Sequence, residues 1–151
     1  MIRATAEAFL ADASPSTAVR QAMATVDGFD ATTWRRVGEE LGWCATTIPE
    51  DFGGLGLTIV EQVILMEQMG RRLFCSPYFA TACLAATALL QVGTPAARQR
   101  YLPAIASGTL TATLAFGECG LDGEAGTVTA TARPSAGGFC LSGRFRHVPD
   151  G

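Results

Sequence analysis

The sequence predicts a mainly α protein, with an all-helical amino-terminal bundle followed by the first antiparallel strands of a second, β-rich domain. Two observations support this fold class. Up to about Gly108, apolar residues recur at helical spacing between clear helix start and stop signals, and beyond it they alternate as in a strand. With 151 residues, 48% of them hydrophobic and 17% charged, the chain has the composition of a globular protein. We therefore expect domains at 1–108 and 109–151.

The first helices are predicted from capping residues. Ser14 is expected to cap a helix that begins at Pro15, because proline is favoured at the first helical position. A second helix follows Asp30, a good N-cap, and ends at Gly42. The apolar face of this second helix consists of Trp34, Val37 and Leu41.

A stronger start signal stands at Thr58. Glu61 follows three residues later, and this spacing is typical of a capping box. The helix that it opens is apolar around much of its circumference and stops near Gly70. The pattern predicts that this helix is buried on more than one side.

Two further helices complete the predicted bundle. The pair Ser76-Pro77 opens an almost wholly apolar helix that ends at Gly93, and this is the best candidate for the central helix. Thr94 starts the last helix. Because proline disrupts a helix interior, Pro103 predicts a break near residue 102.

The remaining sequence predicts strands. Leucine, alanine and phenylalanine alternate with threonine and alanine over 109–116, which is the period of a half-buried strand. A loop rich in glycine and acidic residues separates this strand from two more, expected over 127–133 and 139–146. Three strands cannot close a barrel or cover both faces of a sheet, so the sheet is expected to be incomplete.

Charge and cysteine usage exclude several classes of function. A formal net charge of −3 and a pI near 5.1 provide no basic surface for nucleic acid. The five cysteines are odd in number and widely spaced, without a CxxC pair or a histidine cluster, so we expect a reduced, cytoplasmic protein without a metal site. The opening segment lacks the features of a signal peptide, and the longest apolar run, over 79–90, is too short to span a membrane.

Several motifs together resemble the acyl-CoA dehydrogenase family. The most specific are Leu41-Gly42-Trp43 and the segment Ile48-Pro49-Glu50-Asp51-Phe52-Gly53-Gly54-Leu55-Gly56-Leu57. Further matching residues follow in the order found in the family. They are Glu67, Gly70-Arg71, Pro77, Gly93-Thr94, Arg98-Gln99-Arg100-Tyr101-Leu102-Pro103 and the segment 105–108 that ends the helical domain. The glycines of the second motif fit a tight interhelical connection better than direct ligand contact, because glycine is the default residue of any strained turn.

The resemblance implies flavin-dependent α,β-dehydrogenation of an acyl-CoA, with FAD as cofactor and an incomplete β-barrel as the second domain. In the family, the helix that here begins at Pro77 forms a wall of the acyl pocket. The positions it implies for substrate contact are Thr81, Cys83, Leu84 and Thr87. Plain core packing is the favoured interpretation for each of them taken singly, since apolar residues at helical spacing are most often simply buried.

The flavin positions implied by the resemblance are Phe116, Gly117, Glu118, Leu121, His147 and Pro149. Several depart from the family pattern. Gly117 stands where a threonine is usual, and Leu121 lies near the position of a serine. His147 and Pro149 replace an aromatic residue and a threonine. For His147, the only histidine, stacking on the flavin competes with a general-base role and with an ordinary half-exposed strand position, which is favoured.

The resemblance assigns no catalytic residue to this chain, because the family's base is a carboxylate from a later helical domain. We therefore expect a fragment or subunit that is inactive alone. Its expected substrate is an acyl-CoA, and its expected electron acceptor is an electron-transfer flavoprotein or a similar protein. It is expected to belong to a homo- or hetero-oligomer. Two alternatives remain open. One is a structural partner subunit of a hetero-oligomeric dehydrogenase, and the other is a non-enzymatic helical interaction module.

Overall fold

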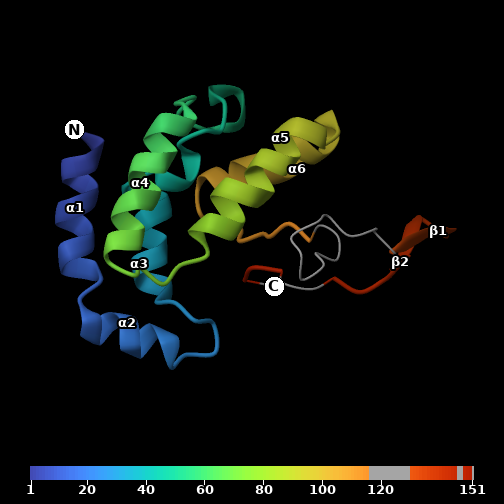
Figure 1. Ribbon diagram of the computed structural model, residues 1–151. Coiled ribbons are helices and arrows are strands. Elements are labelled where there is room, and N and C mark those ends of the chain that lie inside the picture. Colours follow the sequence, from blue (N-terminus) through green and yellow to red (C-terminus); the bar gives the residue numbers. More distant parts are fainter. Residues whose placement is uncertain (116–129, 146–147, 151) are drawn as a thin grey trace, which may run out of the picture. The chain divides into compact units, whose positions relative to one another are not determined.

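A computed structural model describes residues 1–115, 130–145 and 148–150. The chain forms two compact units, Met1–Ala112 and Thr113–Gly151. The first unit is helical throughout and the second contains a two-stranded antiparallel hairpin, which confirms the predicted fold class (Figure 1). No helix in the described parts of the chain is long and apolar enough to cross a membrane.

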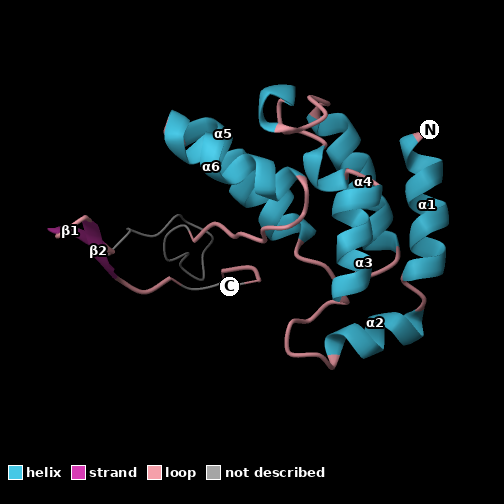
Figure 2. Ribbon diagram, turned by 180° about the vertical axis from the view of Figure 1, so that it is seen from behind, coloured by secondary structure: helices cyan, strands magenta, loops and turns pink. Residues whose placement is uncertain are grey.

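The helical unit contains six α-helices, two π-helical segments and two short 3-10 turns. In chain order these are α1 (Ile2–Ala13), α2 (Ser16–Met23), α3 (Ala31–Arg35), the π-helix η1 (Arg36–Glu40), the 3-10 turns η2 (Trp43–Ala45) and η3 (Glu50–Phe52), α4 (Ile59–Arg71), the π-helix η4 (Phe79–Ala85), α5 (Ala86–Val92) and α6 (Pro95–Ala106). Helix α1 packs along α4, and α5 packs on α6, as both ribbon views show (Figures 1 and 2).

Two hydrophobic clusters hold these helices together. The first joins α1, α3, η1 and α4 and includes Leu10, Trp34, Val37, Trp43, Leu65 and Tyr78. The second lies between η2, α5 and α6 and includes Ile48, Ala86, Leu102 and Ile105. Burial of these side chains is the main favourable term in folding of the unit.

Most of the predicted helix boundaries are confirmed. The Asp30 carboxylate accepts a hydrogen bond of 2.7 Å from the backbone N–H of Thr33. This bond is the principal cause of the lowered pKa of Asp30. Gly42 follows η1 with a left-handed φ of 63°, and Gly93 ends α5. Thr94 caps α6 through the N–H of Ala97.

The capping box of α4 is present as predicted. The N–H of Val60 donates to Thr58 Oγ1 (3.2 Å), and the N–H of Thr58 donates to Glu61 Oε2 (2.9 Å). The Thr58 hydroxyl also donates to Glu61 Oε2, at 2.6 Å. These bonds lower the pKa of Glu61, the side-chain bond from Thr58 being the largest cause.

This pKa shift predicts an acid-dependent loss of stability. The folded pKa of Glu61 lies below its unfolded value, so its contribution is present above the unfolded pKa and is lost as pH falls through the folded pKa. We expect Glu61→Gln to flatten the decrease in unfolding free energy between roughly pH 5 and pH 3. Denaturant unfolding at a series of pH values measures this, and an unchanged pH profile would contradict it.

Other local predictions need correction. Helix α2 begins at Ser16 with Pro15 in the capping position, and the Ser14 hydroxyl instead donates to the carbonyl of Arg72 (3.1 Å). Helix α1 was not predicted, and it has no side-chain cap. Helix α6 runs through Pro103 without the expected break. The helix ends three residues later, at Ala106. Proline has no N–H, so Pro103 cannot donate the usual helical hydrogen bond to the Gln99 carbonyl. Gln99 is exposed, and water can take the place of that bond.

Helix α4 is buried on one side, not on several as predicted. Ile59, Val60 and Val63 are 63%, 59% and 57% exposed, whereas Leu65 is fully buried. The apolar residues around this helix are visible in the sequence. That no element among residues 1–115 covers its outer face is visible only in the structure.

Within the described residues, the strands of the second unit have other bounds than predicted. Strand β1 (Thr131–Ser135) pairs antiparallel with β2 (Gly138–Ser142), with Arg133 opposite Cys140. Pro134 therefore lies inside a strand and not in the turn, which is tolerated because both strands are edges. Residues 109–115 of the first predicted strand form no strand, since tertiary hydrogen bonds described below replace sheet pairing.

Candidate functional site

The candidate acyl-binding residues lie on the continuous helix formed by η4 and α5. One side of this helix is buried, at Ala80, Thr81, Ala82, Ala85 and Ala86. Cys83 and Leu84 are half-buried, and Thr87 is exposed. The structure thus leaves Leu84 and Thr87 on the accessible side of the helix. The half-buried Cys83 packs against the first hydrophobic cluster, and Thr81 faces the buried side.

The π-helical segment η4 was not predicted, and it falls on this candidate wall. A π-turn widens the helix, and such turns occur often at functional sites. The Ala82 carbonyl within η4 accepts a hydrogen bond from Gln62 Nε2 of α4 (3.3 Å), and Gln62 is buried. This bond satisfies a backbone group in the irregular segment.

Thr81 has a structural role that the sequence did not indicate. Its hydroxyl donates to the Ala112 carbonyl (3.0 Å) and accepts from the Ala112 N–H (3.1 Å). One side chain thus makes both bonds that a neighbouring strand would make, and it holds the extended chain after α6 against η4. Leu110 N–H donates to the Ala104 carbonyl and fixes the same segment to α6. Thr81 is therefore not free to contact a ligand.

Replacing Thr81 with valine is expected to release this segment. The change keeps the side chain's shape but leaves two backbone groups of Ala112 unpaired, which destabilises the unit by roughly 1–3 kcal/mol. Hydrogen exchange should become faster at residue 112 than elsewhere in the unit. The matched variant Thr87→Val, on the exposed side, should leave exchange unchanged, and equal effects of both variants would contradict the assigned role.

Burial suppresses thiol chemistry at the two cysteines of this region. Burial raises the pKa of Cys83 to about 11. Burial, with a smaller effect of Cys83, raises the pKa of Cys44 to about 12. Both thiols therefore stay protonated at neutral pH and are poor nucleophiles. No group of three or more His, Cys, Asp or Glu side chains suited to a metal occurs among the described residues.

The glycine-rich loop is a tight connection and not a phosphate cradle. Its backbone N–H groups are used inside the loop: Gly53 donates to Glu50, Gly54 to Pro49, Leu55 to Ala45 and Gly56 to Ile48, all between 2.9 and 3.1 Å. No N–H of these residues is left for an anion. The structure agrees with the interpretation favoured from the sequence.

Of the six predicted flavin positions, only Pro149 belongs to the described residues. Its carbonyl accepts a hydrogen bond from Thr113 Oγ1 (2.6 Å), and proline has no N–H to donate. The other five, Phe116, Gly117, Glu118, Leu121 and His147, lie outside the described residues. Pro149 therefore offers no backbone hydrogen-bond donor.

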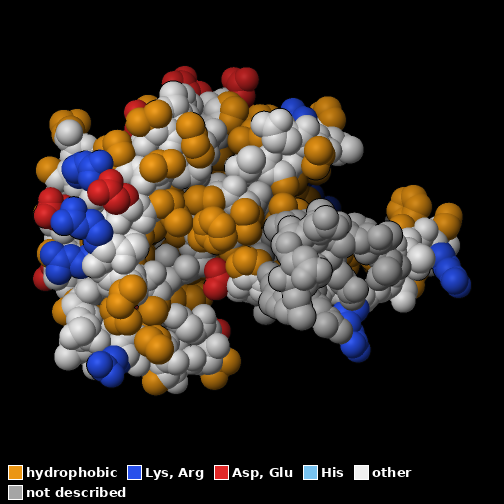
Figure 3. All heavy atoms as spheres, in the orientation of Figure 1, with side chains coloured by type: hydrophobic (Ala, Val, Ile, Leu, Met, Phe, Trp, Pro, Cys, Tyr) orange, Lys and Arg blue, Asp and Glu red, His pale blue; other side chains and the backbone are white. Residues whose placement is uncertain are grey.

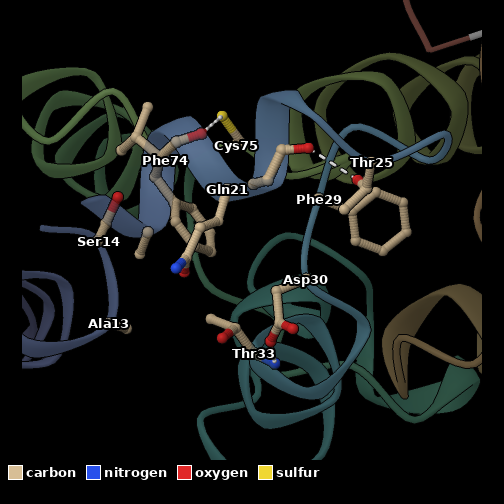
Figure 4. Close-up of a pocket in the computed structure, with 12 residues that line it drawn as sticks. Ala13, Ser14, Gln21, Thr25, Phe29, Asp30, Thr33, Phe74 and Cys75 are labelled. Atoms are coloured by element: carbon tan, nitrogen blue, oxygen red, sulfur yellow. Dashed lines mark hydrogen bonds between the residues drawn. The ribbon is translucent and has the colours of Figure 1, made fainter. Parts of the chain in front are cut away.

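A cavity of about 280 Å³ lies elsewhere in the helical unit, between α2, α3 and the segment after α4 (Figure 4). Several of its polar groups are engaged with the chain itself. Thr25 donates to the Ala22 carbonyl, Asp30 caps α3, and the Cys75 thiol faces the Val19 carbonyl. These three groups are therefore occupied by contacts within the fold.

Comparisons with known proteins agree with this architecture. The acyl-CoA dehydrogenase N-terminal domain matches residues 1–109. Acyl-CoA dehydrogenase IpdE2 of Mycolicibacterium smegmatis is 34% identical over 116 residues, which cover 77% of this chain and 36% of that protein. The present chain therefore spans about a third of that relative.

Solved structures give the same result. A variant of the Tcur3481-Tcur3483 steroid ACAD superposes with a TM-score of 0.85 at 28% identity, covering 99% of this chain and 40% of that one. The ChsE4-ChsE5 complex of Mycobacterium tuberculosis gives 0.82 at 25% identity, covering 97% and 39%. An acyl-CoA dehydrogenase of Bacillus anthracis complexed with FAD gives 0.80 at 27% identity, covering 95% and 25%. The motifs, the helical unit and these matches together show that the chain belongs to the acyl-CoA dehydrogenase family.

Proposed function

We propose that these residues form the amino-terminal part of a flavin-dependent enzyme that removes hydrogen from the α and β carbons of an acyl-CoA thioester. Residues 1–108 would be its helical domain and residues 109–151 the start of its middle β-domain. The observation that carries the proposal is that Leu84 and Thr87 stay accessible on the continuous helix of η4 and α5, whose other side is core. An apolar strip with one hydroxyl suits the hydrocarbon part of a thioester.

FAD, when bound, would accept the β hydrogen as hydride. The described residues of this chain contribute shape and exclusion of water, not the redox chemistry or the base that removes the α proton. Thr81 keeps the chain after α6 in place, and Pro149 offers no donor. The positions at Gly117 and Leu121 carry no side-chain hydroxyl. We therefore expect the 151 residues alone to show no turnover.

The same lack of donors favours a second candidate. This chain could serve as the structural partner in a hetero-oligomeric dehydrogenase in which another subunit holds the flavin. Its likeness to a chain of the ChsE4-ChsE5 complex supports that arrangement. In either case we propose an electron-transfer flavoprotein or similar protein as the acceptor. The free thiols described at Cys44, Cys75, Cys83 and Cys140 suit a cytoplasmic enzyme.

The acyl-binding strip can be tested in the protein encoded by the whole reading frame, purified with its partner subunit where one is encoded. Turnover of acyl-CoAs of increasing chain length is followed by reduction of a dye. We expect Leu84→Ala to shift the preference toward bulkier acyl groups, with a change in specificity ratio of roughly tenfold or more. Val92→Ala, on the same helix but 84% exposed, is the control. An unchanged preference in Leu84→Ala would exclude this strip from the pocket.

A further inference from the structure

A second surface of the helical unit has the properties of a recognition site. A groove of about 750 Å³ lies between α2 and the carboxyl end of α4. Three of the residues that line it are arginines, Arg20, Arg71 and Arg72, and two are the strongly exposed apolar residues Met23 and Leu73. Arginine side chains (blue) lie beside α1 and α4 and over α2 in Figure 3, with hydrophobic side chains (orange) next to them.

The charges of this arginine groove are not neutralised within the described chain. The ion pairs found among the described residues are Arg3 with Glu67 and Arg36 with Glu40, and neither involves a groove arginine. All three groove arginines are exposed. A protein with a net charge of −3 thus concentrates unpaired positive charge here. Such a concentration attracts and orients an anionic partner.

Leu73 occupies a position that the fold would fill with glycine. Helix α4 ends in a Schellman motif, in which Phe74 N–H donates to the Met69 carbonyl (3.0 Å) and Leu73 N–H to the Gly70 carbonyl (3.2 Å). This motif requires a left-handed residue at Leu73, whose φ is 50°. Glycine adopts that conformation without strain, whereas leucine does not.

The leucine at this position also gains little from the fold. Its side chain is 74% exposed, and Met23 across the groove is 71% exposed. A strained backbone that holds an apolar side chain in water does not stabilise the unit. Strain of this kind is typical of residues kept for binding.

We propose that the arginine groove binds an acidic segment of a partner protein, with an apolar side chain of that segment seated between Leu73 and Met23. The protruding apolar side chains favour a protein segment over a small anion, which the arginines alone would suffice to hold. Arginine and methionine are also enriched at protein interfaces. The carboxylates would pair with the arginines and set the orientation, while the apolar contact would supply much of the affinity.

The test uses the 151-residue protein and three labelled peptides, followed by fluorescence anisotropy. In the first peptide glutamate alternates with leucine, in the second glutamine replaces glutamate, and in the third serine replaces leucine. We expect the first to bind at least about tenfold more tightly than either control peptide. Leu73→Gly should weaken its binding by about tenfold and yet raise the midpoint of unfolding, because glycine relieves the backbone strain.

The arginines are tested in the same way. The double variant Arg71→Gln and Arg72→Gln should weaken binding of the acidic peptide by about tenfold, while Arg100→Gln, on α6 and outside the groove, should not. Three results would overturn the proposal. The first is equal binding of the acidic and glutamine peptides, and the second is unchanged binding in Leu73→Gly. The third is full displacement of the peptide by inorganic pyrophosphate at a concentration equal to that of the peptide. None of these readouts depends on flavin or acyl-CoA.

Discussion

Replacing Gly54 with alanine is expected to destabilise the helical unit by about 3 kcal/mol, through overpacking against a rigid backbone. A Cβ at this position would lie 1.8 Å from the Ile48 carbonyl oxygen and 2.3 Å from its carbon. Ile48 cannot move away, because its side chain is fully buried and its carbonyl accepts the N–H of Gly56. The loop must therefore open to admit the methyl group.

Denaturant unfolding followed by tryptophan fluorescence measures this loss. Both tryptophans, Trp34 and Trp43, are buried in the helical unit, so the signal reports on that unit. Gly70→Ala is the matched control, since nothing lies within 4 Å of a Cβ there. Gly70 lies in the last turn of α4 with helical backbone, so that change should not destabilise the unit. If Gly54→Ala were as stable as the parent protein, the close packing of the loop on Ile48 would be wrong.

Replacing Leu65 with alanine is expected to cost the unit roughly 2–5 kcal/mol. Leu65 is fully buried in the cluster that joins α1 and α4, and its truncation would remove apolar contact and leave a cavity. Val63, two residues earlier on the same helix, is 57% exposed. Val63→Ala should change stability by no more than about 0.5 kcal/mol.

The comparison of these two variants, in the same unfolding experiment, tests which side of α4 is core. A large loss in both would mean that the outer face of α4 is packed as tightly as its inner face, which the structure does not show. A small loss in both would mean that α1 and α4 do not share a core.

Local signals predicted much of this fold. Asp30, Thr58 with Glu61, and Thr94 each cap a helix through their own side chains, and Gly42 and Gly93 end helices. Such caps depend on a few neighbouring residues, so their spacing in the sequence is sufficient. Helix α1 was missed because it has no side-chain cap and buries little more than Ala6 and Leu10.

The failures come from tertiary contacts between distant segments. Alternation over 109–116 predicted a strand, but Thr81 binds Ala112 and satisfies the backbone from a helix 31 residues earlier. The apolar circumference of α4 predicted burial, yet no described element covers Ile59, Val60 and Val63. No pattern in the sequence indicated either π-helical segment.

The candidate site was predicted only in part. The helix carrying Cys83, Leu84 and Thr87 was predicted from the sequence. For Thr81, the favoured interpretation was core packing, and its hydrogen bonds to Ala112 were not predicted. The arginine groove could not have been found from the sequence, because Arg20 and Arg71 are brought together only by the packing of α2 near the end of α4. The sequence offers only one hint of this groove, which is a leucine directly after Gly-Arg-Arg, where a glycine would be expected to end the helix.

We propose that this chain, a member of the acyl-CoA dehydrogenase family, does not by itself hold the flavin. The most direct measurement is the visible absorbance spectrum of the purified 151-residue protein after incubation with FAD and removal of free cofactor. We predict a colourless protein whose spectrum does not respond to acyl-CoA. A yellow protein whose flavin band is bleached by an acyl-CoA would contradict the account.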